Sequence, residues 1–530
     1  MANSTPCLGP WNVNARGFKL PETQTYDLLV VGGGINGVGI ARDAAGRGLR
    51  VALCEMNDLA SATSSASSKL IHGGLRYLEY YQFRLVREAL AEREVLLHNA
   101  PHLVRPLQFV LPHVNTIRPA WLVRLGLFFY DHLGPHPSLP NSKALNLRQD
   151  AAGRPVRGDI RKGFAYYDCW VDDARLVVLN AMSAAGLGAR IMTDTKLVSA
   201  QRPDGTWRAH LLDRRTGTET VVRARVLVNA AGPWVEQVLA DIDAGTDDGG
   251  RQERRMILVK GSHIVVPRLY EGDFAYILQH TDRRVIFVIP FEGDHSLIGT
   301  TDVHYEGDPG MVGISPDETR YLCDAVGAYF TRPVTPDDVR WSFAGVRPLF
   351  GDDADDPSAV TRDYVLDLNM GDGGDAAPLL SVFGGKITTY RRLAEKAMAE
   401  LGRFFPGAGG DWTDAAPLPG GDVGGGGFAG LLADLTGEYP GMPPDLLAGL
   451  ARRHGTLARD ILGSATTPGD LGRRFGAGLT EREIDYLVAN EWAATADDIL
   501  WRRTKCGLHL DDGQRQLVLD YLAGQRSMAK

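Results

Sequence analysis

Three glycines near the start of the chain have the spacing of a turn that binds a dinucleotide. They follow the apolar run 26–31, and small and apolar residues continue at helical spacing over 35–47. The three are Gly32, Gly34 and Gly37. Such a turn lets the backbone approach a pyrophosphate at the positive end of the helix. Because Glu55 ends a second apolar run about 20 residues later, where its carboxylate can accept bonds from ribose hydroxyls, the pattern favours a dinucleotide site over a glycine turn without a ligand.

Two later segments decide between FAD and NAD. One follows the apolar run 227–229, and the other precedes a predicted helix over 391–401. Both resemble the flavin-contacting segments of FAD oxidoreductases of the D-amino-acid oxidase fold. Amides at the start of that helix can stabilise negative charge on a reduced flavin. We therefore expect FAD, with contacts from Ala231, Gly232, Gly385, Lys386 and Thr388.

The elements that would position these residues fall into successive parts of the chain. The β-α-β unit is followed by an irregular polar segment, 61–69, which predicts a binding loop, and by a predicted helix over 79–99. The run 226–229 is expected to return to the first sheet. Strand-like runs at 256–260, 263–266, 285–291 and 297–300, with a turn at 281–283, predict an antiparallel sheet that covers a ligand.

A composition break separates a C-terminal part from the rest. Residues 417–421 are rich in proline and glycine, and 424–427 are all glycine. Beyond them, 480–483 has the spacing of a capping box and 495–498 opens another predicted helix. The fold class is thus α/β: a Rossmann-like FAD-binding domain of the D-amino-acid oxidase type, an antiparallel β substrate domain and a helical C-terminal domain. The expected boundaries are a loose leader at 1–25, a discontinuous FAD domain at 26–416 with the β domain inserted at roughly 100–170 and 250–350, and the helical domain at 428–530.

Bulk composition excludes several classes of protein. A chain of 530 residues with 44% hydrophobic and 23% charged residues is globular rather than disordered. The net charge of -8 argues against a nucleic-acid partner. The five cysteines are scattered and never form a C-x-x-C pair, so no metal and no disulfide framework is expected, and a reducing cytoplasmic setting fits.

Residues 121–130 form the most apolar stretch of the chain. They are too short to span a bilayer and include Arg124. A helix here would place five large apolar side chains on one face: Trp121, Leu122, Leu125, Phe128 and Phe129. Two interpretations are open, an ordinary buried helix or, given its aromatic residues and the flanking Arg118 and Arg124, a helix lying in the membrane interface.

Several longer motifs indicate a family. Through them the sequence resembles the aerobic, quinone-linked glycerol-3-phosphate dehydrogenase family over nearly its whole length. The matching segments are 62–79, 118–133, 260–266, 298–302, 344–348, 362–364, 382–391 and 417–422. The resemblance implies that Gly32, Gly34, Gly37 and Glu55 bind the ADP half of FAD, and that Thr63, Ser64, Ser68 and Lys69 line the pyrophosphate and the flavin edge. It also implies a peripheral position on the inner face of the cytoplasmic membrane, contact with lipid and a membrane quinone, and a homodimer.

The same resemblance implies that five side chains surround the substrate: Arg76, His263, Arg347, Arg362 and Lys386. Arginines and a lysine suit a phosphate dianion, because a guanidinium donates two parallel bonds. A lone arginine would more often form a surface ion pair, and a histidine in a β pattern more often belongs to the core. In this context a neutral His263 suits the general base that takes a hydroxyl proton, with Arg347 or Lys386 able to share the role.

The implied activity is oxidation of sn-glycerol 3-phosphate to dihydroxyacetone phosphate by hydride transfer from C2 to FAD, with electrons passed to quinone. The nearest alternative is a glycerol-3-phosphate oxidase, which would use oxygen and need no bilayer. An amine or amino-acid oxidase would show one carboxylate-binding arginine rather than a cationic cluster. A flavin-binding protein without activity is disfavoured by the presence of all five substrate residues.

Overall fold

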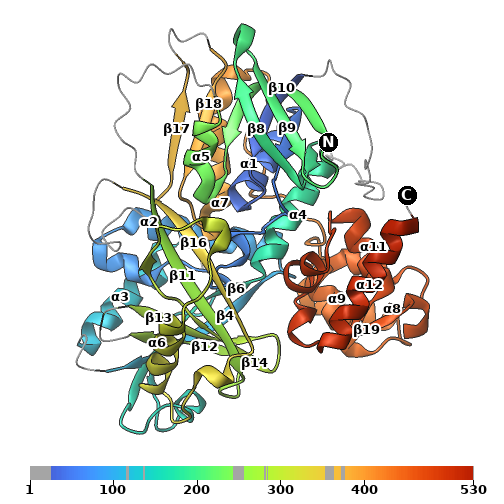
Figure 1. The fold of residues 1–530 in the computed structure, drawn as a ribbon. Helices are drawn as coiled ribbons and strands as arrows, with labels where there is room; N and C mark the ends of the chain where they lie inside the picture. The colour runs from blue at the N-terminus through green and yellow to red at the C-terminus, as the bar shows by residue number, and fades with distance from the viewer. Residues whose placement is uncertain are drawn as a thin grey trace.

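The computed structural model describes residues 25–528 except 115–118, 135–137, 243–255, 280, 281, 283, 352–362 and 372–375. Figure 1 shows two sheet-containing parts stacked on each other and a cluster of C-terminal helices beside them. The expected leader, apart from Thr25, lies outside the described residues, as does most of the turn predicted at 281–283. Within the described residues, no helix is both long enough and apolar enough to cross a bilayer.

The upper sheet carries the β-α-β unit, with strand order β17-β18-β10-β1-β2-β7. Its strands are β1 (Thr25–Val31), β2 (Val51–Cys54), β7 (Arg190–Met192), β10 (Glu219–Asn229), β17 (Val365–Asn369) and β18 (Leu379–Phe383). β10 pairs parallel with β1, so the run 226–229 does return to this sheet. The hairpin β8 (Thr195–Gln201) and β9 (Trp207–Asp213) extends from β10.

Three helices bury the apolar face of this sheet, α1 (Ile35–Gly46), α4 (Asp173–Gly186) and α7 (Tyr390–Leu401). α1 begins directly after the glycine turn and packs between the other two. α5 (Val235–Ala240) lies on the other side of the sheet, near β10 and β18. The parallel strands are buried on both faces, which is why they read as continuous apolar runs.

The lower sheet is mostly antiparallel, with strand order β15-β11-β14-β13-β12-β4-β6-β3. Its strands are β3 (Leu70–Ile71), β4 (Val104–His113), β5 (Lys143–Asn146), β6 (Lys162–Val171), β11 (Met256–Pro267), β12 (Phe274–Gln279), β13 (Val285–Phe291), β14 (His295–Gly299), β15 (Val303–His304) and β16 (Trp341–Phe350). The runs predicted at 256–260 and 263–266 are two halves of the single strand β11. α6 (Pro316–Gly327) packs against β11.

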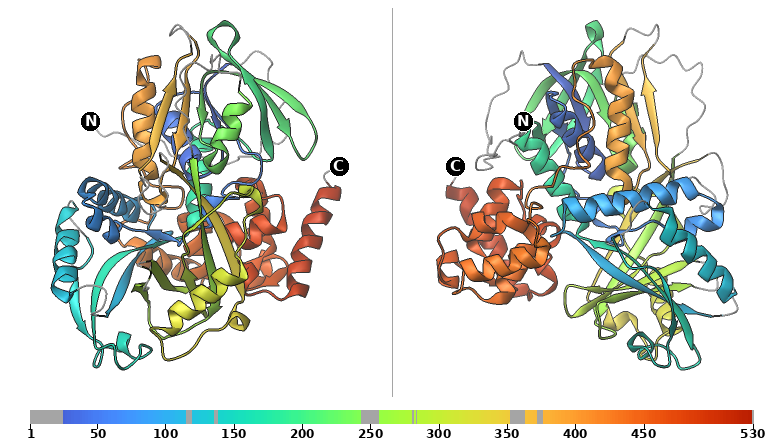
Figure 2. Two further views of the ribbon diagram at one scale, coloured as in Figure 1. Left: turned by 60° about the vertical axis from the view of Figure 1, so that its left-hand side comes forward. Right: turned by 180° about the vertical axis from the view of Figure 1, so that it is seen from behind.

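Two helices flank the lower sheet on the side away from the C-terminal part, as Figure 2 shows. They are α2 (Phe83–Asn99) and α3 (Ala120–Leu133). The helix predicted over 79–99 begins later than expected, because Tyr81 adopts a left-handed conformation with φ of 57°. Residues before it form the separate short helix η2 (Leu75–Tyr80).

The C-terminal part is helical, as expected. It contains α8 (Gly427–Glu438), α9 (Pro444–His454), α10 (Ala458–Leu462), α11 (Glu481–Asn490), the short π-helix η12 (Asp498–Arg503), α12 (Asp512–Met528), and a small pair of strands, β19 (Arg474–Gly476) and β20 (Leu479–Thr480). The Thr480 side chain caps α11 by accepting from the Glu483 N–H, although this bond is long at 3.4 Å.

Buried ion pairs join this helical part to the upper sheet. Arg503 donates two bonds to Asp58, at 2.6 and 2.7 Å. Lys505 pairs with Asp172, the residue that caps α4. Arg175 of α4 pairs with Glu491, with both side chains completely buried. These contacts hold the C-terminal helices against the first turn of α4 and against the loop that follows β2.

Candidate active site

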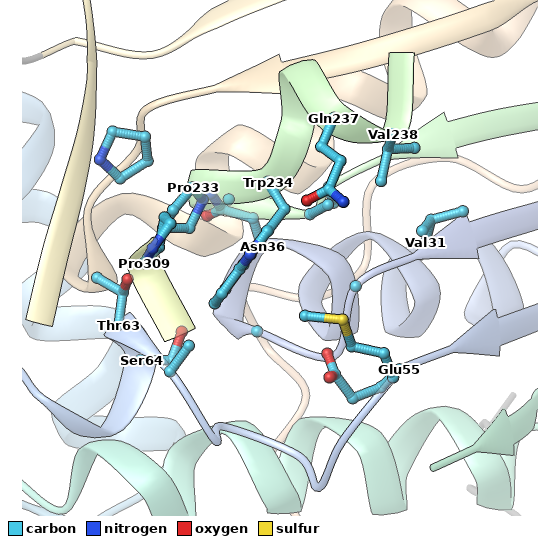
Figure 3. A pocket seen from close by; sticks show the side chains of 18 of the residues that line it. Val31, Asn36, Glu55, Thr63, Ser64, Pro233, Trp234, Gln237, Val238 and Pro309 are labelled. Carbon is cyan, nitrogen blue, oxygen red and sulfur yellow. The ribbon is translucent and has the colours of Figure 1, made fainter. Parts of the chain in front are cut away.

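An elongated cavity of about 670 Å³ lies at the carboxyl ends of β1, β2 and β10. Figure 3 shows its lining, with Glu55 rising from the end of β2 and Gln237 and Val238 coming from α5. Ligands of parallel α/β sheets bind at this edge. Of the expected cofactor contacts, the following line this cavity: Gly32, Gly34, Glu55, Thr63, Ser64, Ala231, Gly232 and Gly385.

The glycine turn has no room for side chains at two positions. Gly32 has a φ of 112°, and a Cβ there would lie 2.4 Å from the carbonyl oxygen of Ala230. A Cβ at Gly37 would lie 2.0 Å from the carbonyl oxygen of Gly32. Gly34 is different, since only the Ser64 hydroxyl lies near its free face. The first two glycines therefore allow the chain to fold tightly, and Gly34 keeps the cavity wall bare.

Replacing Gly37 with alanine should therefore lower the FAD content of the purified protein by about tenfold or more, since overpacking of this kind costs about 1–3 kcal/mol. The ratio of flavin to protein absorbance, read with the melting temperature, measures it. Gly430→Ala is the matched control, because Gly430 lies in α8 with no atom near its added Cβ. Equal FAD content in the two variants would contradict the role given to Gly37.

Glu55 is held by the backbone around it. Its two carboxylate oxygens accept from the Gly33 N–H at 2.7 Å and the Asn57 N–H at 2.8 Å. Burial raises the pKa of Glu55, and these two bonds oppose that rise. Each carboxylate oxygen has a second lone pair, so the group can still accept from a ribose hydroxyl.

The loop at 61–69 connects the two sheets. The Thr63 hydroxyl donates to the Val346 carbonyl at 2.6 Å, and the Ser64 hydroxyl accepts from the Ile35 N–H at 3.0 Å. Lys69 does not line the elongated cavity: its buried ammonium donates to both oxygens of Asp173, at 2.8 and 3.0 Å. Its expected contact with FAD stays a prediction, and this ion pair favours an indirect role through the shape of the loop.

A second cavity of about 230 Å³ adjoins the first and shares Ile35, Thr63, Ser64, Gly384 and Gly385 with it. It brings together three of the five expected substrate residues: His263, Arg347 and Lys386. Ser68 and Thr388 also line it. Arg76 does not line it, and Arg362 lies outside the described residues.

His263 is buried in β11, where its ring stacks on Phe343 at a centroid distance of 4.8 Å. Its Nε2 and the Ser68 hydroxyl are 2.9 Å apart. Its Nδ1 is buried and has no hydrogen-bond partner among the described residues. Burial lowers the pKa of His263 to about 3, and the nearby cations Lys69 and Arg347 add to the effect. The imidazole is therefore neutral at physiological pH.

The two cations of this cavity come from different parts of the fold. Arg347 lies on β16 and donates to Asp302 and, at 3.2 Å, to the Thr301 carbonyl. Lys386 directly precedes the turn into α7, and its ammonium lies 3.9 Å from the centroid of the Tyr77 ring. The cavity thus brings an arginine, a lysine and a neutral histidine together.

His72 is a site residue that the sequence analysis did not select. It lines the second cavity, and its main-chain N–H donates to the Thr388 hydroxyl at 3.3 Å. Burial lowers the pKa of His72 to about 4, and Lys386 adds to the effect. Its place directly before Gly73 and Gly74, in a motif already matched for Arg76, was the available signal.

The two cavities together fit FAD. The elongated one has a bare glycine turn and the N-terminus of α1 where a pyrophosphate would lie. Asn36, beside it, has a buried amide oxygen without a hydrogen-bond partner among the described residues. The smaller cavity reaches the turn before α7, where amides would face a flavin ring. Gly32, Gly34, Glu55, Thr63, Ser64 and Gly385 are the residues placed to hold it.

Comparison with known proteins agrees with this geometry. Residues 27–391 match a family described as FAD dependent oxidoreductase, and 412–520 match one described as the C-terminal domain of alpha-glycerophosphate oxidase. The chain is 53% identical to D-erythritol 1-phosphate dehydrogenase of Brucella abortus, covering 95% of this chain and 98% of that one. It is 53% identical to glycerol-3-phosphate dehydrogenase of Pseudomonas aeruginosa, covering 95% and 96%. It is 50% identical to aerobic glycerol-3-phosphate dehydrogenase of Escherichia coli, covering 94% and 97%.

A solved structure has the same architecture. Glycerol-3-phosphate dehydrogenase from Bacillus halodurans, complexed with FAD, matches with a TM-score of 0.76 and 29% identity, over 96% of this chain and 92% of that one. The match includes the C-terminal helices as well as both sheets. The fold is therefore that of the D-amino-acid oxidase type, with an added helical domain.

Proposed function

This chain belongs to the FAD-dependent glycerol-3-phosphate dehydrogenases, and on that premise we propose that it oxidises sn-glycerol 3-phosphate to dihydroxyacetone phosphate and passes the electrons to a membrane quinone. One observation supports the substrate most directly. An arginine, a lysine and a neutral histidine line one small cavity that adjoins the FAD cavity. A phosphate needs the first two, and an alcohol that loses a proton needs the third.

Bound FAD supplies the hydride acceptor for C2. The chain's own residues then bind the phosphate, orient C2 and hold the hydroxyl proton. Lys386 and Arg347 are the described cations placed to bind the phosphate, with Arg362 and Arg76 as further candidates from the sequence. His263 takes the hydroxyl proton, with its Nε2 beside the Ser68 hydroxyl that also lines the cavity.

A longer polyol phosphate is a second candidate substrate. The relative named D-erythritol 1-phosphate dehydrogenase is as similar to this chain as the Pseudomonas glycerol-3-phosphate dehydrogenase. Both substrates combine a phosphate with a secondary alcohol, so the same cations and base would serve either. Substrate length therefore has to be settled by direct comparison of the two.

Anaerobic bleaching of the flavin tests the proposal. Glycerol 3-phosphate should reduce the bound flavin, and the reduced state should persist after air is admitted. Rapid reoxidation in air would favour the oxidase alternative instead. If D-erythritol 1-phosphate bleaches the flavin with a much lower KM than glycerol 3-phosphate does, D-erythritol 1-phosphate becomes the proposed substrate, and the proposed chemistry is unchanged.

The acceptor proposal rests on α3. Its apolar face is exposed rather than buried: Trp121 is 66%, Phe128 49% and Phe129 43% accessible. Leu122 and Leu125 are exposed on the same helix, while Leu127 and Tyr130 alone are buried in it. Neighbouring Tyr81 and Phe83 extend the apolar surface, since the Phe83 and Phe129 rings are 6.4 Å apart.

We assign this surface to a lipid bilayer, where a peripheral enzyme on the inner face of the cytoplasmic membrane would meet its quinone. A homodimer stays a prediction from the resemblance.

Replacing both Phe128 and Phe129 with serine should move the protein from the membrane to the soluble fraction, because it removes apolar area from the proposed lipid contact. Reduction of an artificial dye should be unchanged. The matched control is Leu517→Ser with Leu519→Ser on α12, whose side chains are 44% and 48% accessible. Membrane pelleting of the two double variants is the measurement. Release by both, or by neither, would contradict the assignment to α3.

A further inference from the structure

Tyr130, on the buried side of α3, reaches the main chain of the substrate cavity. Its hydroxyl accepts from the Gly73 N–H at 2.9 Å. The same hydroxyl donates to the Asp168 carboxylate, with oxygen distances of 2.7 and 2.8 Å. Tyr130 and Asp168 are both buried. A buried donor and acceptor that are fully paired fix a main-chain position firmly.

Asp168 joins four elements at one carboxylate. It lies on β6, and it accepts from Arg93 of α2 at 3.0 Å as well as from Tyr130 of α3. The Gly73 N–H also lies 3.4 Å from one of its oxygens. Burial raises the pKa of Asp168 to about 6, and Arg93 and Tyr130 oppose that rise. The group is therefore an ionised acceptor near neutral pH, which strengthens the bond from the Tyr130 hydroxyl.

Packing around Gly73 leaves no room for a side chain. β3 ends at Ile71, opposite Cys169 on β6, so Gly73 no longer has a ladder partner and bonds to side chains instead. A Cβ at Gly73 would lie 2.6 Å from both the Leu90 side chain and the Tyr130 hydroxyl oxygen. A shift of Tyr130 would therefore shift the main chain at Gly73.

The residues on either side of Gly73 form part of the cavity wall. His72 precedes it, and Tyr77 follows after a turn in which the Tyr77 N–H donates to the Gly74 carbonyl at 2.8 Å. The Tyr77 ring lies against the Lys386 ammonium, at 3.9 Å from its centroid. The main chain at Gly73 thus determines where three groups of the cavity meet: the His72 imidazole, the Tyr77 ring and the Lys386 ammonium.

We infer that Tyr130 and Asp168 are positioning residues for substrate binding, which fix the main chain at Gly73 so that His72 and Tyr77 are held beside Lys386 in the cavity wall. The inference rests on the proposed function, since Lys386 is there the cation that meets the substrate phosphate. It also makes α3 a structural part of the substrate site, because its buried Tyr130 contacts the cavity segment while its exposed apolar face is the one assigned to the bilayer.

Tyr130→Phe tests the inference, because it removes one hydroxyl and leaves the ring. KM for glycerol 3-phosphate should rise about tenfold while kcat changes less than about threefold, since the flavin and His263 are untouched. Inorganic phosphate, followed by the change in flavin absorbance, should bind more weakly by a similar factor. Asp168→Asn keeps the side-chain shape, weakens the same bonds and should raise KM in the same direction.

Tyr166→Phe is the matched control. Tyr166 is also buried and packs edge-on against Tyr130 at 5.7 Å, but in the described part of the chain its hydroxyl makes no hydrogen bond. It should leave KM unchanged. An unchanged KM in Tyr130→Phe would overturn the inference, and so would an equal rise of KM in Tyr166→Phe. A loss of FAD or a lower melting temperature in Tyr130→Phe, without any change in KM, would overturn it as well. If glycerol 3-phosphate does not reduce the flavin of the wild-type protein, the proposed function is refuted instead.

Discussion

Alanine in place of His263 should slow reduction of the flavin by glycerol 3-phosphate by about 100-fold or more, while FAD stays bound. The residue lines the cavity, and its loss removes the only described histidine that contacts Ser68. Because burial lowers the pKa of His263 to about 3, the imidazole stays neutral well below physiological pH. Protonation of His263 should therefore cause no fall in kcat/KM when the pH is lowered by about one unit from neutrality. Single-turnover anaerobic mixing measures the rate directly.

Two other variants sharpen this test. Ser68→Ala removes the partner of Nε2 and should cost less than the loss of the imidazole itself. His210→Ala, on β9 in the hairpin of the other sheet, is the control and should leave the rate unchanged. If His263→Ala is nearly as fast as the wild type and His72→Ala is slow, the base is His72, which lines the same cavity.

Glycerol should be oxidised with a kcat/KM about 1000-fold or more below that of glycerol 3-phosphate. Without the phosphate, the cations of the cavity would lose a charged partner in a partly desolvated setting, a loss of several kcal/mol. The same reasoning predicts that Arg362→Lys, which keeps the charge but loses the bidentate fork, raises KM for glycerol 3-phosphate about tenfold, and that Arg362→Ala raises it further. Steady-state dye reduction with both substrates is the measurement.

Arg347 and a surface arginine complete this comparison. Arg347→Lys should also raise KM, although its guanidinium is already engaged by Asp302 and a part of its effect would pass through that pair. Arg320→Lys, on the outer face of α6 and 61% accessible, should change nothing. Comparable efficiency with glycerol and glycerol 3-phosphate in the wild type would refute a phosphate site. An unchanged KM in both Arg362 variants would remove that residue from it.

Sequence patterns predicted the parts of the fold whose interactions are local. β1, the glycine turn and α1 follow one another without a break, and each is visible in the spacing of apolar and small residues. The long strands β4 and β6 were missed, because β4 contains Pro106 and Pro112 and neither strand alternates cleanly. The two prolines of β4 are tolerated because the partner strand β6 fixes the register of β4 within the sheet.

The candidate site was harder to predict where partners are distant in sequence. Lys69 was expected at the cofactor, yet its ammonium pairs with Asp173, which no local pattern links to it. His72 and Arg76 share one motif, yet His72 lines the cavity and Arg76, which follows the left-handed Gly74, does not. Residue types could be selected from the resemblance. Only the folded chain shows which of them meet.

The buried ion pairs between the nucleotide-binding part and the C-terminal helices also bear on how the protein is made. Asp58, Asp172 and Arg175 leave the ribosome long before their partners Glu491, Arg503 and Lys505. Until those partners arrive, burying the early charges would leave them uncompensated, at about 3–5 kcal/mol for each broken pair. The start of α4 is therefore expected to take its final buried position only after the C-terminal helices have been synthesised, so their docking is a late step in folding.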